Sequence, residues 1–401
     1  MKKRILFVDN NPLLLRTYAE MLNEDRDRWE VATACEAGQA METMDRESFD
    51  VVVCEASLPG ARSIELFSKI KKRHPHASRI LMSDYSEQED FTNSFKVAHQ
   101  FLAKPFDVKT LKATLGRISA LDAFLQDDNL RSLIGLLGAL PTFPSLYFQI
   151  VKELKSEEPS LENVANIIAK DPSLTAKMLQ AVNSAMFGLA NRVSNPFDAV
   201  QYLGMSMVQS LAISAHVFSS FEKTTLNGFS ADQLWAHSMR SASRARAIMR
   251  AEKSDAADIE DACTAAMLHD IGKLMLADNL PELYHQALAL ASKDNILLHE
   301  AEQKIFGATH AGAAAYLLGL WGLPATIVEA VAFHHAPGRS SLRAFGPLTA
   351  VHVADVLEHK SRTATSSGAP PEFDLNYLIE IGVQNRLDAW RTQTANSSAA
   401  M

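Results

Sequence analysis

The sequence is poor in cysteine: Cys35, Cys54 and Cys263 are the three among 401 residues. An odd number of widely spaced cysteines, with no Cys-x-x-Cys pair, excludes a disulfide framework and a closed thiolate metal site. Such thiols are typical of small buried side chains in a reducing compartment. We therefore expect a cytoplasmic protein.

Long hydrophobic runs are missing as well. The longest, such as Leu133–Leu140, are far shorter than the roughly 20 apolar residues that cross a bilayer. The basic start, Lys2-Lys3-Arg4, leads at once into a strand-like run that ends at Asp9, which is not the pattern of a secretory signal. The sequence therefore predicts neither a membrane anchor nor an export signal.

Positive charge is scarce, because 39 Lys and Arg face 47 Asp and Glu for a net charge of −8. A chain with this balance repels a phosphate backbone, so nucleic acid is not an expected partner. With 47% apolar residues in 401, the chain has enough material for two hydrophobic cores, and we expect two domains.

Short apolar runs alternate with helical patterns over residues 1–120. Five such runs predict strands: Ile5–Val8, Trp29–Thr33, Val51–Cys54, Arg79–Met82 and Gln100–Ala103. Continuous apolar strands between helices are typical of an α/β fold, a flavodoxin-like, doubly wound, five-stranded parallel sheet covered on both faces. In such sheets, functional groups gather beyond the carboxyl ends of the strands.

Polar residues follow those strand ends: Asp9, Asn10, Glu55, Ser83 and Lys104, the last before Pro105. This set resembles the receiver domain of bacterial two-component response regulators over about residues 1–120. In that family an acidic pair at the positions of residues 9 and 10 holds Mg²⁺, and an aspartate at the position of residue 55 accepts a phosphoryl group. The resemblance implies that Ser83 and Lys104 contact that group, and that the partners are a sensor histidine kinase or a downstream regulator.

Two positions depart from the receiver pattern. Glu55 replaces the aspartate that accepts the phosphoryl group, and its extra methylene lets the carboxylate reach Lys104 without phosphorylation. Asn10 replaces the second acid and lacks the charge to hold Mg²⁺. Because phosphoryl transfer depends on metal charge and positioning, we predict a degenerate receiver, locked in one conformation or used for dimer contacts. The alternative is that Glu55 is a tolerated surface acid in a packing module.

Residues 121–134 are predicted to form a connecting helix or linker, with a break at Asp127-Asp128-Asn129. If the helix continues from the receiver, its apolar stripe is a candidate homodimer contact; packing on its own domain is the alternative. From residue 135 onward the patterns are helical, and we divide this region into 135–222 and 230–360.

Four linked motifs in this region, Leu140-Pro-x-x-Pro, Asp171-Pro-Ser-Leu-Thr, Val182-Asn-Ser-Ala and Ala199-Val-x-x-Leu-Gly, are similar to those of HDOD domains, helical signalling modules distantly related to HD phosphohydrolases. Asn183 and Gly204 are expected to have structural roles at helix ends.

A second group of residues carries metal-ligand chemistry. The adjacent pair His269-Asp270 can turn toward one divalent cation, and further imidazoles and a carboxylate lie in helical segments on either side: His237, His310, His334, His335 and Asp355. This order resembles that of the HD superfamily, and closely that of HD-GYP cyclic-di-GMP phosphodiesterases. The resemblance implies that these seven residues bind a divalent metal pair, Fe, Mn, Mg or Zn, with Lys273 near the substrate phosphate.

Three features weigh against hydrolysis. The Gly-Tyr-Pro substrate loop of that family is missing after His335, Gln233 stands where some of its sites add a glutamate, and HDOD modules as a class are regarded as non-catalytic. As a structural alternative, His334 and His335 cap a helix, and Asp355 pairs with His352 or Arg343.

The sequence therefore leaves two hypotheses. The first is a signalling protein in which a receiver with Glu55 controls an HDOD output module that acts by protein contacts. The second is a metal-dependent phosphohydrolase acting on a cyclic dinucleotide or a nucleotide, with Asp270 and Lys273 as catalytic residues. Beyond residue 360 we expect a loop at 361–372, closing helices at 373–392 and a disordered tail at 393–401.

Overall fold

The structure is a computed structural model of the chain and describes residues 2–58, 63–74, 77–84, 98, 100–112, 114–115, 128–137, 145–154, 156, 158–183, 193–221, 230–361 and 369–398. The chain divides, in the main, between Gln126 and Asp127 into two compact units. Each unit is described by itself below.

The first unit contains the predicted parallel sheet. Its strands are β1 (Lys3–Val8), β2 (Trp29–Ala34), β3 (Val51–Glu55), β4 (Ser78–Asp84) and β5 (Gln100–Lys104). They are all parallel and lie in the order β2-β1-β3-β4-β5. The carboxyl ends of β1, β3 and β5 therefore meet at one edge of the sheet, which brings residues 9, 55 and 104 together.

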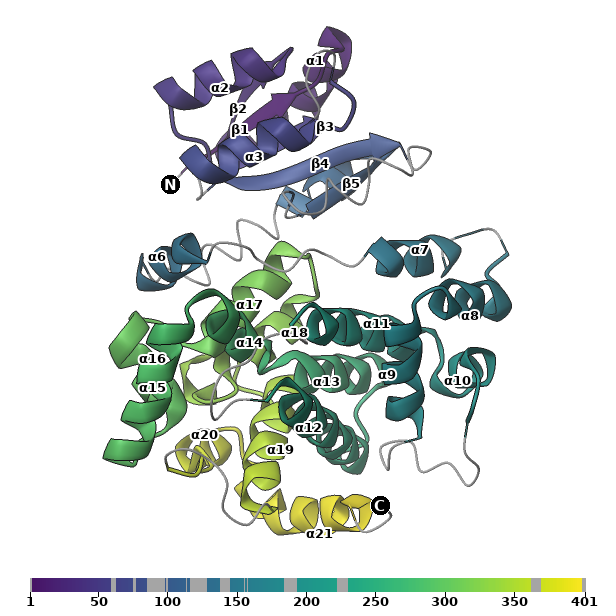
Figure 1. Cartoon of the computed structure of the whole chain (residues 1–401), viewed down its shortest axis with the longest axis vertical. Coiled ribbons are helices and arrows are strands. Elements are labelled where there is room, and N and C mark those ends of the chain that lie inside the picture. Colours follow the sequence, from purple (N-terminus) through teal and green to yellow (C-terminus); the bar gives the residue numbers. More distant parts are fainter. Residues whose placement is uncertain are drawn as a thin grey trace. The chain divides into compact units, whose positions relative to one another are not determined.

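Side chains that alternate along the strands build two separate cores, one on each face of the sheet. Leu6 and Val8 point to a face covered by α2 (Ala37–Arg46) and α3 (Ser63–Arg73). Ile5 and Phe7 point to the opposite face, which is covered by α1 (Pro12–Met21) and by the helical residues 108–115 as far as they are described. A 3₁₀ turn, η1 (Asn23–Asp25), follows α1. The sheet and its helices are shown in Figure 1.

The second unit is helical throughout its described residues. Its first helices are α6 (Asp128–Leu136), α7 (Ser145–Leu154), α8 (Leu161–Ala169), α9 (Pro172–Val182), α10 (Pro196–Leu203) and α11 (Met205–Ser220). The next are α12 (Ala231–Ala251), α13 (Ala256–Leu268), α14 (Ile271–Asn279), α15 (Pro281–Asp294), α16 (Leu298–Phe306) and α17 (His310–Leu320). The last are α18 (Ala325–Phe333), η2 (Pro337–Arg339), α19 (Pro347–Ser361), α20 (Leu375–Glu380), η3 (Gln384–Arg386) and α21 (Leu387–Ser398).

Two helices, α13 and α19, form the centre of this unit. Residues 347–358 of α19 and 262–268 of α13 are buried, because small alanines and apolar side chains surround each helix instead of forming one stripe. Both helices pack against α12 and α18 (Figure 1). His269 directly follows α13 and Asp355 lies on α19, so the predicted metal ligands belong to the deepest part of the unit.

Polar side chains and a glycine lie at helix ends in the described part of this unit. Asp171 caps α9, accepting a hydrogen bond from the Leu174 amide at 3.0 Å, and Pro172 begins that helix. The Asn183 side chain bonds the backbone of Val193, whose amide donates to it at 2.8 Å. Gly204 has φ of 75° between α10 and α11, a conformation that favours glycine. Ser184 and the motif at 140–144 lie outside the described residues.

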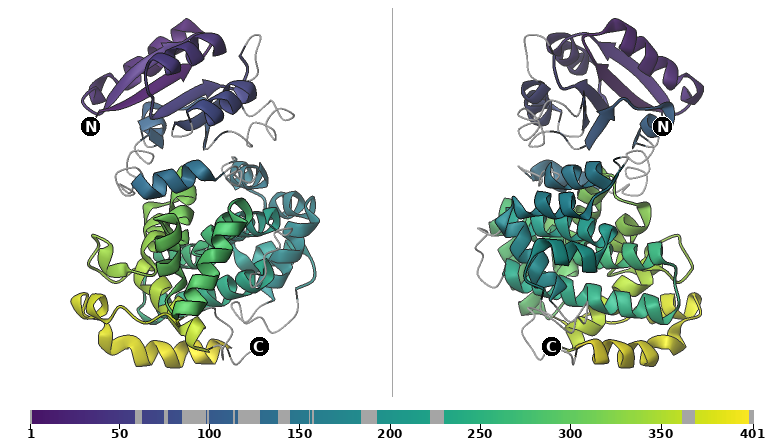
Figure 2. Two further views of the ribbon diagram at one scale, coloured as in Figure 1. Left: turned by 60° about the vertical axis from the view of Figure 1, so that its left-hand side comes forward. Right: turned by 90° about the vertical axis from the view of Figure 1, so that its right-hand side faces the viewer.

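The C-terminal region differs from our expectation. Residues 393–398 were predicted to be disordered, but they continue the helix α21. This helix packs against α12, and its residues Trp390 and Thr394 are buried. Glu252 at the end of α12 accepts hydrogen bonds from the Trp390 indole and the Arg386 guanidinium, both at 2.8 Å, and these anchor the helix. The polar composition of residues 393–401 suggested disorder, because these contacts with a distant helix cannot be read from the local sequence. Figure 2 shows α20 and α21, in yellow, at one end of the helical unit.

Other predicted boundaries are met only in part. The helix α6 begins at Asp128, inside the predicted break, whereas residues 121–127 lie outside the described residues. Residues 362–368, which belong to the predicted loop at 361–372, also lie outside the described residues. Within the described ranges, no helix combines the length and the apolar character needed to cross a bilayer.

Candidate metal centre

Most of the predicted ligands lie where one helix gives way to another. His269 ends α13 and Asp270 precedes α14, His310 opens α17, and His334 and His335 follow α18. His237 and Asp355 instead project from the middle of α12 and α19. The structure brings all seven side chains together, in two groups whose ligand atoms lie within 4.8 Å of one another.

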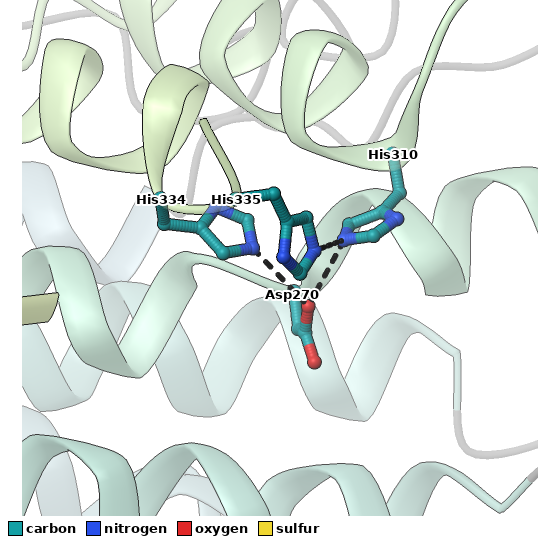
Figure 3. Close-up of side chains that lie close together, drawn as sticks. All are labelled: Asp270, His310, His334 and His335. Atoms are coloured by element: carbon teal, nitrogen blue, oxygen red, sulfur yellow. Dashed lines mark hydrogen bonds and ion pairs between the residues drawn. The ribbon is translucent and has the colours of Figure 1, made fainter. Parts of the chain in front are cut away.

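The first group contains Asp270, His310, His334 and His335 (Figure 3). Asp270 Oδ1 lies 3.2 Å from His310 Nε2 and 3.9 Å from His334 Nε2. His335 Nε2 lies 3.1 Å from His310 Nε2. One carboxylate oxygen and three imidazoles thus converge on a small volume, a donor set that suits a divalent transition metal.

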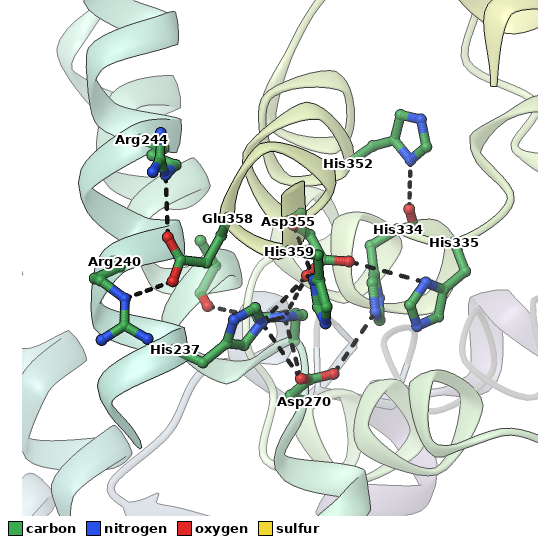
Figure 4. A network of polar contacts seen from close by, with 12 residues as sticks. His237, Arg240, Arg244, Asp270, His334, His335, His352, Asp355, Glu358 and His359 are labelled. Atoms are coloured by element: carbon green, nitrogen blue, oxygen red, sulfur yellow. Dashed lines mark hydrogen bonds and ion pairs between the residues drawn. The ribbon is translucent and has the colours of Figure 1, made fainter. Parts of the chain in front are cut away.

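The second group contains His237, His269 and Asp355. Figure 4 shows His237 and Asp355 of this group. His237 Nε2 lies 3.2 Å from His269 Nε2 and 3.1 Å from Asp355 Oδ1. His269 Nε2 lies 3.6 Å from the same carboxylate oxygen.

Asp270 connects the two groups. Its Oδ1 faces the first group, whereas its Oδ2 lies 3.6 Å from His237 Nε2 and 3.4 Å from His269 Nε2. Lys273 Nζ also contacts Oδ2, at 2.7 Å. Each oxygen of one carboxylate therefore belongs to a different group, which is the arrangement expected of a carboxylate that bridges two cations.

Hydrogen bonds behind the ligands orient three of the imidazoles. His269 Nδ1 lies 2.7 Å from the Ala266 carbonyl, and His334 Nδ1 lies 2.7 Å from the Val331 carbonyl. His310 Nδ1 lies 2.6 Å from Glu302 Oε2. Because Nδ1 must carry the proton in such bonds, Nε2 is left as an acceptor that points into the cluster.

Three buried acceptors in this cluster have ion-pair or ring neighbours but no hydrogen-bond partner among the described residues. Asp270 Oδ1, Asp355 Oδ1 and His334 Nε2 make no hydrogen bond within the part of the chain that the structure describes. Buried polar atoms are almost always satisfied, since an unmade hydrogen bond costs about 1–3 kcal/mol. Three orphaned acceptors at one place fit a cation, so the residues present are compatible with a metal.

The pKa shifts of Asp270 and His334 agree with ligands kept in their metal-binding forms. Burial alone would raise the pKa of Asp270, but the neighbouring charges of His269 and Lys273 outweigh it and hold the pKa well below its usual range. Burial, reinforced by His269, holds the pKa of His334 well below its usual value. A carboxylate and a neutral imidazole are the forms that coordinate metals.

The cluster is buried but not sealed. The side chains of His237, His269, Asp270, His310, His334 and Asp355 are at most 6% exposed. Lys273, His335 and His359 retain 11%, 14% and 25%. These three are therefore the side chains of the cluster that solvent contacts most.

As an alternative to metal binding, the sequence suggested that His334 caps a helix and that Asp355 pairs with His352 or Arg343. The first is observed and the second is not. His334 does bond the end of its own helix, but only through Nδ1, which leaves Nε2 in the cluster. His352 bonds the His334 carbonyl, at 2.7 Å, and Arg343 bonds Glu380, at 2.8 Å. Neither is the partner of Asp355, which faces His237 and His359 instead.

Some residues around the site were not predicted. Glu302 holds His310, His359 Nδ1 lies 3.0 Å from Asp355 Oδ1, and Glu358 binds Arg240 and Arg244 (Figure 4). The i, i+4 spacing of Asp355 and His359 on one helix was a signal that was available in the sequence. The pairing of Glu302 with His310 crosses a turn between two helices, so no helical period indicates it.

The predicted receiver residues also meet, at the edge of the sheet. Lys104 Nζ lies 3.2 Å from Asp9 Oδ2 and forms an ion pair with Glu55 Oε2, while Glu55 Oε1 accepts a hydrogen bond from the Ala56 amide at 2.9 Å. Asn10 is exposed. Ser83 lies on β4 in register with Ala103, and its side chain lies outside the described residues.

Comparisons with known proteins agree with this architecture. Residues 5–116 match the family model of the response regulator receiver domain, and residues 140–337 match that of the HDOD domain. A crystal structure of an HDOD domain protein from Geobacter sulfurreducens is 22% identical, with a TM-score of 0.56 over 70% of this chain and 95% of that one. At that identity it shows the fold alone.

Among curated relatives, an uncharacterized protein of Treponema pallidum (strain Nichols) is 26% identical over 51% of this chain and 39% of its own length. The transcriptional regulatory protein ZraR of Escherichia coli (strain K12) is 27% identical over 39% of this chain and 38% of its own length. The chain thus spans about two fifths of the length of these relatives. Taken together, the fold and the two family matches show that the chain consists of a response regulator receiver domain followed by an HDOD domain, the composition of a signal-transduction protein.

Proposed function

We propose that the chain is a cytoplasmic signal-transduction protein of the response-regulator type, in which a receiver fixed by Glu55 controls an HDOD output module that acts through protein contacts. The observation that carries this proposal is the position of Lys104, whose ammonium binds Asp9 and Glu55 at once. The free thiols Cys35, Cys54 and Cys263 suit a reducing compartment.

Glu55 makes the contact that phosphorylation would otherwise supply. Its side chain is 14% exposed and that of Lys104 is 16%, so this ion pair is mostly shielded from water. Although burial lowers the pKa of Lys104, the hydrogen bond and charge of Glu55 outweigh it and raise the pKa above its ordinary value. The lysine is therefore held as a cation, and this shielded contact supports a functional role for Glu55 over that of a tolerated surface acid.

The same contacts disfavour Mg²⁺ at the receiver. Lys104 neutralises part of the charge on Asp9, and Asn10 contributes none. A hard cation such as Mg²⁺ is held mainly by carboxylate charge, and here the ammonium of Lys104 offsets the charge of Asp9 and Glu55. The proposal therefore has no phosphorylation step, and its partners are other signalling proteins, with a second copy of the chain among them.

Mass spectrometry of the full chain after incubation with acetyl phosphate and Mg²⁺ tests this proposal. We expect no added phosphoryl group on the natural chain. The matched variant Asn10→Asp/Glu55→Asp restores both acids and is expected to gain one, which shows that the assay works. A stable phosphoryl group on the natural chain would refute the fixed receiver.

A second candidate function is favoured by the two ligand groups that share Asp270. His237, His269 and Asp355 would hold one divalent cation, and His310, His334 and His335 the other, with Asp270 between them. Such cations supply Lewis acidity and lower the pKa of a bound water, which is the chemistry of phosphodiester hydrolysis. Fe, Mn, Mg and Zn all remain candidates, and a cyclic dinucleotide is the candidate substrate.

Two features rank hydrolysis below the signalling function. Lys273 is bound to Asp270, so contact with a substrate phosphate requires its ammonium to share or leave that carboxylate. After His335 the chain turns directly into η2, without the substrate loop of the phosphodiesterases it resembles. Metal-loaded chain that hydrolyses cyclic-di-GMP, with His269→Ala inactive, would promote this candidate; no turnover with bound metal would remove it.

A further inference from the structure

The two ligand groups stand in unequal electrostatic surroundings. A buried carboxylate that takes no part in ligation supports the first group, and a lysine contacts the carboxylate oxygen that faces the second. We propose that the two groups bind divalent cations with unequal affinity, that the position at Asp270, His310, His334 and His335 is filled first, and that Glu302 is the positioning residue responsible. This inference rests on the proposed metal-holding role of the cluster.

Glu302 is positioned to act on His310 and on no other ligand that the structure describes. Its Oε2 accepts from the His310 backbone amide at 2.8 Å and lies 2.6 Å from His310 Nδ1, and the residue is fully buried on α16. The two contacts fix both the backbone and the ring of His310. A carboxylate behind a histidine makes that histidine a stronger ligand, because it favours the charge that the imidazole donates to the cation.

The other oriented imidazoles lack a carboxylate at this place. His269 in the second group and His334 in the first rest on backbone carbonyls, which carry only partial charge. Glu302 therefore adds a full negative charge next to the first group. At short range and away from water, one unit charge is a large contribution to the binding of a divalent cation.

The second group has a carboxylate ligand of its own, Asp355, but the oxygen of Asp270 that faces this group is already bound by a lysine. Lys273 Nζ lies 2.7 Å from Asp270 Oδ2, the oxygen that faces His237 and His269. A cation in this group must share that oxygen with an ammonium. Asp270 Oδ1, on the side of the first group, makes no hydrogen bond among the described residues and is free to coordinate.

Calorimetric titration of the chelator-treated full chain with Mn²⁺ tests the inference. We expect two binding steps, the first at least about tenfold tighter than the second. Glu302→Gln keeps the shape and removes the charge, and it is expected to weaken the first step by about 10–100-fold, the usual effect of losing such a support. The second step should stay within about twofold.

A matched variant separates position from charge. Glu300→Gln removes the same charge from the same helix at an exposed site, and its amide oxygen can still accept the hydrogen bond from the Leu297 amide. It is expected to leave both steps unchanged. Lys273→Met should tighten the second step by roughly tenfold, because it removes the competing ammonium.

Ligand variants assign the two steps to their groups. His335→Ala is expected to remove the tight step, and His237→Ala the weak one. Two steps of equal affinity, or a first step that Glu302→Gln leaves unchanged, would overturn the unequal pair but not the metal-holding role. A natural chain that binds no Mn²⁺ would overturn both.

Discussion

Gly272 and His310 approach so closely that a Cβ atom at residue 272 would lie 2.0 Å from the carbonyl oxygen of His310. The first turn of α14 thus lies directly against the first residue of α17. Because backbone cannot yield as a flexible side chain can, only glycine fits here. We therefore expect Gly272, two residues after Asp270, to determine how closely Asp270 approaches His310.

Gly272→Ala is expected to displace His310 and weaken the first metal-binding step by at least about tenfold, with a loss of about 1–3 kcal/mol in stability from the overpacking. Calorimetry and urea unfolding measure the two effects. Gly346→Ala is the control, since a Cβ at residue 346 meets nothing within 4 Å. Equal behaviour of the two variants would contradict this role of Gly272.

Glu358 on α19 forms ion pairs with two arginines of α12 beside the candidate metal centre. Its carboxylate lies 2.5 Å from Arg240 Nε and 3.2 Å from Arg244 Nε, and the side chain is 1% exposed. Replacing one member of a buried ion group leaves the others unpaired, so Glu358→Ala should lower the free energy of unfolding by about 3–5 kcal/mol.

The control for Glu358 is Glu372→Ala, which removes an ion pair with Lys360 in which Glu372 is 73% exposed. An exposed pair contributes about 0–1 kcal/mol, so the melting temperature should barely change. A Glu358→Ala chain as stable as this control would show that the arginine contacts do not hold the two helices together.

Asp261 gives a pH dependence that is independent of the metal. Burial raises its pKa, and the hydrogen bond from the Thr326 hydroxyl lowers it by less. An acid whose pKa is raised on folding favours the folded state below its unfolded pKa, and this contribution is lost as the pH rises through the folded pKa. From about pH 4 upward, the natural chain should therefore lose stability relative to Asp261→Asn, whose amide oxygen still accepts from Thr326.

Thermal unfolding of both chains across pH 3–8 measures this difference in stability. The variant should be the more stable one at pH 7, and the gap should close toward pH 3. A gap of the opposite sign, or one that does not depend on pH, would mean that burial of the Asp261 carboxylate has no cost.

Removal of metal should destabilise the helical unit. A ligand that binds only the folded chain adds about 4 kcal/mol at a concentration one thousand times its dissociation constant. Chelation followed by differential scanning calorimetry should therefore lower the melting temperature of the natural chain, and added Mn²⁺ should restore it. In a His269→Ala/His310→Ala chain, which loses a ligand from each group, chelator should have little effect.

Much of the fold could be predicted from the sequence, because the patterns depend on local residues. Continuous apolar runs such as Val51–Cys54 indicated the parallel strands, and the order of polar residues at their ends placed Asp9, Glu55 and Lys104 at one edge. The seven candidate metal ligands were named from residue type, order and family resemblance, and the structure brings their side chains together.

Other features depend on contacts between distant segments, which no local pattern reveals. Asp270 can be recognised as a ligand from the sequence, but that its two oxygens face different groups follows only from the packing of α12, α14 and α17. The helical end of the chain was missed for the same reason, since Trp390 is held by Glu252, far away in sequence. Glu302 was overlooked because acids on helix surfaces are common.

The central claim is that these side chains hold two cations on either side of the Asp270 carboxylate. Anomalous X-ray scattering at the manganese edge, from crystals of the full chain grown with Mn²⁺, tests it most directly. The account predicts two anomalous peaks, one among His310, His334 and His335 and the other among His237, His269 and Asp355. The absence of any peak there, or peaks only elsewhere on the chain, would contradict it.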